Sequence, residues 1–201
     1  MKERKKEKNR AGEVIEAATT GFTAQCYQLY ELPPLGSLVQ TASDGLEIYG
    51  IVCNAATAGI EPGRRPIARG RDAADQDAVY KSSPQLEKLL RSEFEVLVVG
   101  YKDKDGIRQY LPPTPARIHS FVYLCSDDEV KQFSQCLVFL SILLNANTSL
   151  PPEELVAACL RQMSRVQTDS HTFLVNAGKH LATLLSGDYS QLKAVLERIR
   201  R

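Results

Sequence analysis

The chain has no tryptophan, few aromatic residues and no apolar run long enough to cross a bilayer. Tyrosine and phenylalanine together make up 7% of its 201 residues. The longest apolar stretch, from Cys136 to Leu144, is interrupted by Ser141, whereas a transmembrane helix needs about 20 residues. Met1 leads into a charged run and not into the apolar segment of a signal peptide. These absences predict a soluble, cytoplasmic protein.

Motifs for nucleotide hydrolysis and metal binding are also missing. A phosphate-binding loop needs G-x-x-x-x-G-K-[ST], but around Gly178-Lys179 the first glycine is replaced by Phe173 and the final hydroxyl by His180. The three histidines have no cysteine or carboxylate at metal-ligand spacing, and the cysteines form no C-x-x-C pair. We therefore expect no enzyme activity, no metal and no cofactor.

The five cysteines are odd in number, which argues against a complete set of disulfides. Cys26, Cys53, Cys136 and Cys159 lie within apolar runs, and Cys125 ends another. This pattern favours small buried thiols in a reducing compartment.

Positive charge is concentrated in two places. The net charge is +1, yet the first ten residues carry six Lys or Arg against two Glu. The remainder is therefore negative and a poor general ligand for a phosphate backbone. Residues 1–10 are predicted to form a disordered basic arm, which is either a solvating tail or a tether to nucleic acid or an anionic membrane. A second basic spot, in a loop with Pro and Gly, contains Arg64, Arg65, Arg69 and Arg71.

Short alternating segments bounded by turn residues are typical of a small β-barrel. The predicted strands are Gly12–Ala17, Thr23–Tyr30, Ser37–Thr41, Leu46–Asn54, Phe94–Tyr101, Ile107–Leu111 and Ile118–Leu124. Gly50 indicates a bend or bulge where the barrel turns a corner. Residues 55–82 are interpreted as a long insertion, followed by a short helix that starts at Ser83 or Pro84.

Helical patterns begin at Ser126, which forms a capping-box pattern with Glu129. The first predicted helix runs from Asp127 to about Asn145, and the apolar character of its second half indicates a central or covered helix. Three more helices are predicted to start at Pro151-Pro152, at a cap on Ser170, and at Asp188 or Ser190.

The predicted fold class is therefore α+β. A small N-terminal six-stranded β-barrel occupies residues 11–125, and a C-terminal helical bundle occupies residues 126–201. A bundle of about 75 residues is marginal by itself, so we expect it to pack on the barrel or on another chain.

Several segments of the first part of the chain resemble a known module. They include Gly36-Ser-Leu-Val39, Ile48-Tyr-Gly-Ile-Val52, Phe94 to Gly100 and Leu111-Pro-Pro113. Over about residues 11–135 the chain resembles the HAS-barrel, the amino-terminal region of HerA-type DNA translocases that also occurs in the catalytic subunits of rotary ATP synthases. In those families the barrel forms a crown that organises subunits around a ring. The resemblance therefore implies subunit association, without the ATPase domain that follows the barrel in the translocases.

The preferred hypothesis is a non-catalytic adaptor or assembly factor whose barrel associates with itself or with a ring ATPase. Three surfaces are predicted to bind the partner: an edge from Phe94 to Tyr101, the arginine loop, and the apolar helix with Leu137, Phe139 and Leu140. One alternative is a nucleic-acid accessory factor tethered by residues 1–10. Another is a barrel that binds a small molecule, although no convergent set of polar residues is visible in the sequence.

Overall fold

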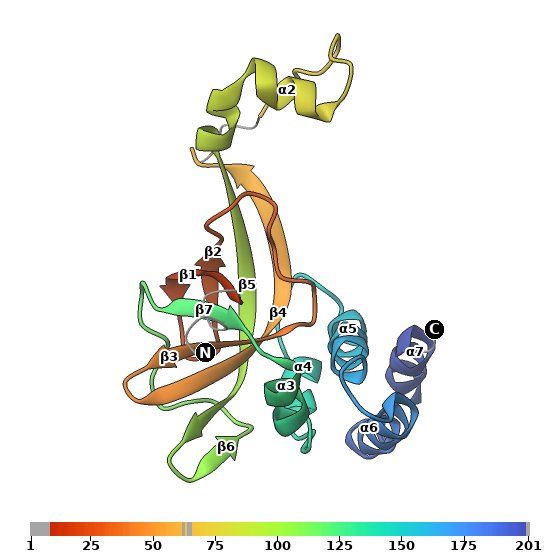
Figure 1. Ribbon diagram of the computed structural model, residues 1–201. Helices are drawn as coiled ribbons and strands as arrows, with labels where there is room; N and C mark the ends of the chain where they lie inside the picture. Colours follow the sequence, from red (N-terminus) through yellow and green to blue (C-terminus); the bar gives the residue numbers. More distant parts are fainter. Residues whose placement is uncertain (1–8, 62, 64–65, 200–201) are drawn as a thin grey trace.

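A computed structural model describes residues 9–61, 63 and 66–199. Figure 1 shows a sheet-rich body with helices packed against one side of it. The strands are β1 (Arg10–Ala17), β2 (Gly21–Gln25), β3 (Leu38–Ser43), β4 (Leu46–Gly59), β5 (Leu90–Asp103), β6 (Gly106–Arg108) and β7 (Phe121–Leu124). The helices are α2 (Gln76–Ser82), the 3-10 helix η1 (Pro84–Leu89), α3 (Asp127–Phe133), α4 (Leu140–Leu144), α5 (Pro152–Ser164), α6 (Ser170–Leu184) and α7 (Tyr189–Ile199).

Six of the strands close into an antiparallel barrel, which confirms the predicted fold class. The strand order is β2-β1-β7-β3-β4-β5, and pairing of β2 with β5 closes the ring. β6 pairs with β5 outside the barrel. The bulge predicted at Gly50 is present, because the β4–β5 register shifts between Tyr49 and Gly50. A Cβ at Gly50 would lie 2.3 Å from Val96 Cγ1, so glycine lets the two strands approach closely.

The barrel interior is filled by aliphatic side chains and two phenylalanines. They include Val14, Phe22, Ala24, Val39, Ile48, Val52, Phe94, Val96, Val98 and Val122. On β3 and β4 these positions alternate with residues of the second apolar core, such as Leu38, Tyr49 and Ile51, so both faces of these two strands are buried. The centre of the small closed barrel is packed with side chains.

The C-terminal helices pack on the outer wall of the barrel and share a second apolar core with it. This core joins Tyr49 and Ile51 of β4 to helical residues such as Phe133. The rings of Tyr49 and Phe133 lie 5.2 Å apart. Of the two arrangements expected for the bundle, the structure shows packing against the barrel.

The prediction of a single helix from Asp127 to about Asn145 is wrong. It is divided into α3 and α4, which leaves residues 134–139 between them. The side-chain amide of Gln109 donates to the carbonyl oxygens of Phe133 and Cys136, each at 2.8 Å. These bonds from a distant loop satisfy the backbone groups that a continuous helix would have paired.

Local capping signals place most of the other helix starts. The capping box is present, since Ser126 N–H donates to Glu129 Oε2 at 2.7 Å and Glu129 N–H donates to Ser126 Oγ. α5 begins at Pro152 as predicted. The cap of α6 is Asp169 and not Ser170, because Asp169 Oδ1 accepts the N–H of Thr172 at 2.9 Å.

The boundaries of several strands differ from the predicted ones. β2 ends at Gln25, so residues 26–37 are a loop, and β6 and β7 are shorter than predicted. Arg10 begins β1 and pairs with Tyr123, which places a strand within the stretch predicted as a disordered arm. Residues 1–8 of that arm lie outside the described residues.

Candidate functional site: a projecting arm

An arm leaves the barrel at one end. β4 and β5 remain paired after the β3–β4 pairing has ended, from Ala55 opposite Phe94 to Gly59 opposite Leu90. Residues 60–89 join these strands and contain α2 and η1. Figure 1 shows the ribbon rising clear of the barrel with α2 at its far end. We define the arm as the described residues from Ala55 to Glu93.

The segment predicted to be an insertion, residues 55–82, begins with five residues that belong to β4 and ends with α2. Alanine and glycine are depleted in strands, so Ala55-Ala56-Thr57-Ala58-Gly59 has a weak strand signal by itself. The segment is nevertheless the end of β4, because β5 supplies its hydrogen-bonding partners. Pairing with β5, and not local propensity, therefore makes residues 55–59 a strand.

A buried hydroxyl holds the base of the arm together. Ser92 is 1% exposed. Its Oγ lies 2.7 Å from Thr57 Oγ1 and accepts the backbone N–H of Tyr30 at 2.9 Å. The carbonyl oxygen of Ser92 also accepts the N–H of Cys26 at 2.9 Å. The loop that follows β2 is thus fixed along the β5 side of the arm.

The far end of the arm consists of two short helices that bury no residue. Asp75 caps α2 by accepting the N–H of Ala78 at 2.8 Å, and Pro84 occupies the first turn of η1. Neither α2 nor η1 contains a buried residue. Tyr80 of α2 contacts Tyr30 through their hydroxyl groups, and this hydrogen bond raises the pKa of Tyr30. Isolated helices of this length are unstable in water, so α2 and η1 contribute little stability by themselves.

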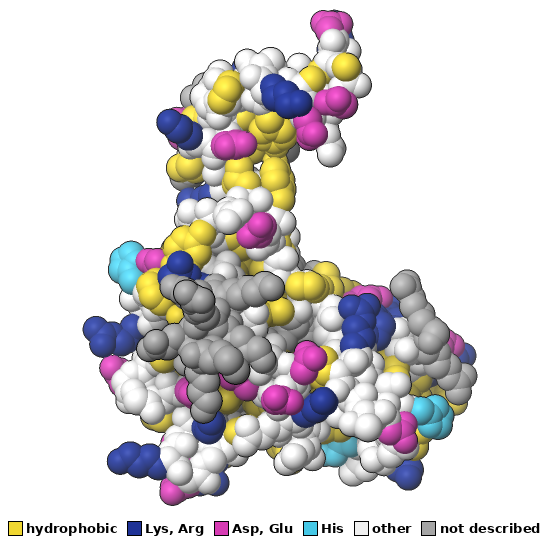
Figure 2. Space-filling model, viewed as in Figure 1, with side chains coloured by type: hydrophobic (Ala, Val, Ile, Leu, Met, Phe, Trp, Pro, Cys, Tyr) yellow, Lys and Arg dark blue, Asp and Glu magenta, His cyan; other side chains and the backbone are white. Residues whose placement is uncertain are grey.

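Apolar side chains are exposed at this end of the arm. Ile67 is 74% exposed, and Ile60 and Leu89 are exposed by 44% and 47%. They line a cavity of about 230 Å³ together with Pro66, Leu86 and Leu90. Figure 2 shows apolar, basic and acidic side chains side by side over this end of the molecule. A mixed apolar and charged surface of this kind is typical of protein interfaces.

The predicted arginine loop lies in the arm. Arg69 and Arg71 are exposed, and Arg69 lines the cavity described above. Arg64 and Arg65 lie outside the described residues. Of the two described arginines, the structure therefore places Arg69 beside the exposed apolar residues.

The predicted interaction edge from Phe94 to Tyr101 is not an edge. β4 pairs with β5 on one side of this segment, and on the other side β2 pairs with it as far as Leu97 and β6 from Tyr101. Phe94 is 1% exposed and belongs to the barrel interior. Tyr101 is half-buried and its ring packs edge-to-face on Tyr110 at 5.6 Å. These residues contribute to the fold and offer little surface to a partner.

The predicted apolar helix face is also covered within the chain. Phe139 and Leu140 are 0% exposed and pack in the core shared with the barrel. Leu137 is partly buried against the same core. A covered helix was expected from its apolar character, and the barrel wall and α5 together supply the cover.

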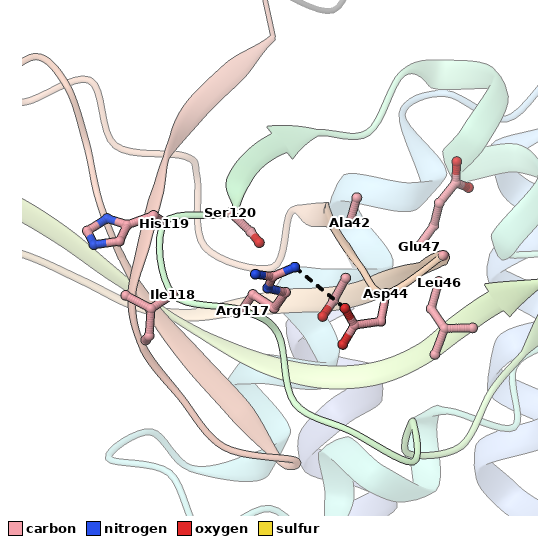
Figure 3. A pocket seen from close by; sticks show the side chains of 10 residues that line it. Ala42, Asp44, Leu46, Glu47, Arg117, Ile118, His119 and Ser120 are labelled. Carbon is pink, nitrogen blue, oxygen red and sulfur yellow. Dashed lines mark ion pairs between the residues drawn. The ribbon is translucent and has the colours of Figure 1, made fainter.

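A polar hollow of about 500 Å³ lies between residues 42–47 and 117–120. Arg117 and Asp44 form an exposed ion pair of 3.7 Å across it. His119 and Glu47 lie at opposite ends of the hollow in Figure 3. The side chain of His119 bonds to Glu13 of β1, outside this hollow. The imidazole of His119 is thus held by Glu13, and the interaction across the hollow is the Arg117–Asp44 ion pair.

The cysteines differ in exposure. Cys26, Cys53, Cys125 and Cys159 are buried, whereas Cys136 is exposed. Burial raises the pKa of Cys26 and of Cys53 to about 11, which disfavours the reactive thiolate. Within the described ranges, no group of three His, Cys, Asp or Glu side chains is arranged to hold a metal ion.

Comparison with known proteins gives no match: no protein-family model and no curated protein matches this chain. The resemblance to the HAS-barrel therefore remains a prediction. In the part of the chain that the structure describes, no helix combines the length and apolar character needed to span a membrane.

Sequence reasoning missed the residues that make the arm distinctive, above all Ile60, Ile67 and Leu89. One signal was available, since the run from Val52 to Ile60 contains no charged residue. An uncharged run beside a charged segment is typical of a strand that ends in a polar loop. The sequence does not show which strand this run pairs with, and the structure shows that it pairs with β5.

Proposed function

We propose that this chain is a cytoplasmic, non-catalytic interaction module, an adaptor or assembly factor that binds another protein chain through its arm. The observation that carries the proposal is the end of the arm, where α2 and η1 bury no residue and Ile67 is 74% exposed. A partner surface would bury the apolar side chains that stay exposed or half-buried at this end of the arm.

The resemblance to the HAS-barrel supports an assembly role, because barrels of that family organise subunits around a ring. It makes a second copy of this chain and a ring ATPase the two candidate partners. The proposal moves the binding surface away from Phe94, Phe139 and Leu140, which are buried, and onto the arm. The nucleic-acid alternative depends mainly on residues 1–8, which lie outside the described residues.

Photo-cross-linking from the arm tests this function. Ile67 would be replaced by p-benzoylphenylalanine in the full chain, and adducts would be identified by mass spectrometry after irradiation of the native cell. The matched control is Tyr189 on α7, which is 77% exposed. We expect a discrete adduct with one protein from position 67 and none of that mass from position 189. The absence of a discrete adduct from position 67 would contradict the proposal.

A further inference from the structure

The two long edges of the arm differ in charge and in how far other segments cover them. On the β5 side, the loop after β2 is bonded to Ser92, and Arg91 and Glu93 carry charge. On the β4 side, pairing with β3 stops at Leu38 opposite Ile51. Among the described residues, no strand pairs with that side of β4 from Asn54 to Gly59. One edge of the ribbon is therefore covered and charged, and the other is open.

The open edge presents regularly spaced backbone groups. Ile60 N–H donates to Leu89 O at 2.9 Å, so the backbone of Ile60 faces β5. In an antiparallel ladder, alternate residues direct both N–H and C=O to the same side. Gly59, Thr57 and Ala55 therefore direct theirs away from β5. The N–H of Ala55 accordingly donates to the side chain of its neighbour Asn54 at 3.0 Å and not to a strand.

The open edge also lacks the usual protection against pairing. Natural edge strands carry Lys, Pro or bulges that keep other chains away. From Asn54 to Gly59 there is no charged residue and no proline, and the register with β5 has no shift beyond Asn54. Ala55, Ala56 and Ala58 are exposed, so nothing bulky covers the strand.

We propose that the β4 edges of two copies of this chain pair antiparallel about a two-fold axis at Thr57, and that this pairing joins the two ribbons into one four-stranded sheet. The inference rests on the proposed function and names the partner as a second copy. In this register Thr57 lies opposite its own symmetry mate, and Ala55 lies opposite Gly59. The two-fold axis repeats the Ala55–Gly59 pair, so three residue pairs would exchange about six backbone hydrogen bonds.

The sequence of the edge is suited to pairing with itself. A two-fold interface uses the same patch on both subunits, so each residue must tolerate its symmetry-related partner. Here threonine meets threonine, which is a favourable cross-strand pair. On the opposite face of the strand Ala56 meets Ala58. No like charges and no large side chains meet, and the edge contains no charge that would select an unrelated partner.

Charge complementation tests the pairing. Two full-length variants, A56K/A58K and A56E/A58E, place like charges opposite each other across the axis, at exposed positions on the solvent face. We expect light scattering to give twice the chain mass of 22.3 kDa for the unmodified protein and the single mass for each variant. An equimolar mixture of the two variants should recover the double mass. Circular dichroism spectra of both variants should match that of the unmodified protein, which would show that the variants are folded.

A cysteine at the axis provides a second test. In a C136S background, T57C places two thiols on Cα atoms about 5.5 Å apart, within the range of a disulfide. We expect oxidation to give a covalent dimer of T57C and none of A68C, an exposed position on the same arm. An unmodified chain that stays monomeric, or variants that still dimerise, would overturn the pairing. If the pairing is overturned but position 67 still gives an adduct with another protein, the proposed function stands. If there is neither a dimer nor an adduct from position 67, the proposed function is contradicted as well.

Discussion

The side-chain oxygen of Gln109 accepts a hydrogen bond of 3.2 Å from the backbone N–H of Phe139, thirty positions away in the sequence. The amide nitrogen of the same side chain bonds to two carbonyl oxygens, those of Phe133 and Cys136. One polar side chain thus ties the barrel to the turn between α3 and α4. It does so next to Phe139, which is completely buried in the shared core.

Replacement of Gln109 by alanine should destabilise the whole protein. The change removes three hydrogen bonds and leaves partly buried backbone groups without partners, which costs about 1–3 kcal/mol each at full burial. We expect a loss of roughly 2–4 kcal/mol in the free energy of unfolding, since some of these groups can reach water. Chemical denaturation measures this value. The control Gln132→Ala, at an exposed position on α3, should change it by less than about 0.5 kcal/mol.

Gly36 controls the contact between the barrel and α5. It has a φ of +80°, and a Cβ there would lie 2.5 Å from the backbone of Ala158 and Cys159. Gly45 has nearly the same φ, +81°, but a Cβ there meets nothing within 4 Å. Gly45→Ala should therefore cost only the backbone strain of about 1–2 kcal/mol. Gly36→Ala should cost clearly more, because α5 must move. Equal losses in denaturation experiments would show that the close approach is unimportant.

The pKa of Glu13 should depend on His119. Hydrogen bonds from His119 and from Tyr27 lower the pKa of the Glu13 carboxyl below its usual value of 4.5. Because the folded-state pKa is depressed, the stabilising contribution is present above the unfolded-state pKa and is lost as pH falls through the folded-state value. His119→Ala should raise the pKa of Glu13 more than Tyr27→Phe does, since the bond from His119 is the largest cause. NMR titration of the carboxyl carbon measures both, and an unchanged pKa in both variants would contradict the assignment.

Only one thiol of the native protein should react quickly with an aromatic disulfide reagent. Cys136 is exposed, whereas the other four cysteines are buried. Burial of Cys159 raises its pKa, which further lowers the thiolate concentration. We expect one equivalent to react in the folded state and five after denaturation, as the sequence contains five cysteines. In Cys136→Ser the fast equivalent should disappear. Rapid reaction of two or more thiols would show that a buried cysteine is accessible.

Sequence by itself determined the features that depend on neighbouring residues. The alternation of apolar residues predicted the barrel strands, and Gly50 predicted a bulge that the register contains. Ser126 and Glu129 predicted the capping box, and Pro152 predicted the start of α5. The interacting groups of the capping box and the helix start lie within a few positions of one another. Alternation and a glycine within a strand are likewise visible in the sequence, although the strands pair with distant ones.

Tertiary structure decided the features that depend on distant partners. Ala55–Gly59 is a strand because it pairs with β5, and the helix after Ser126 is divided where Gln109 bonds to its backbone. Phe94 faces the barrel interior and not a partner, because β2 closes the ring beside β5. Hydrogen bonding and burial at these positions are set by groups far away along the chain. Local propensity cannot specify such pairings, and only the closed barrel shows which strand edge remains open.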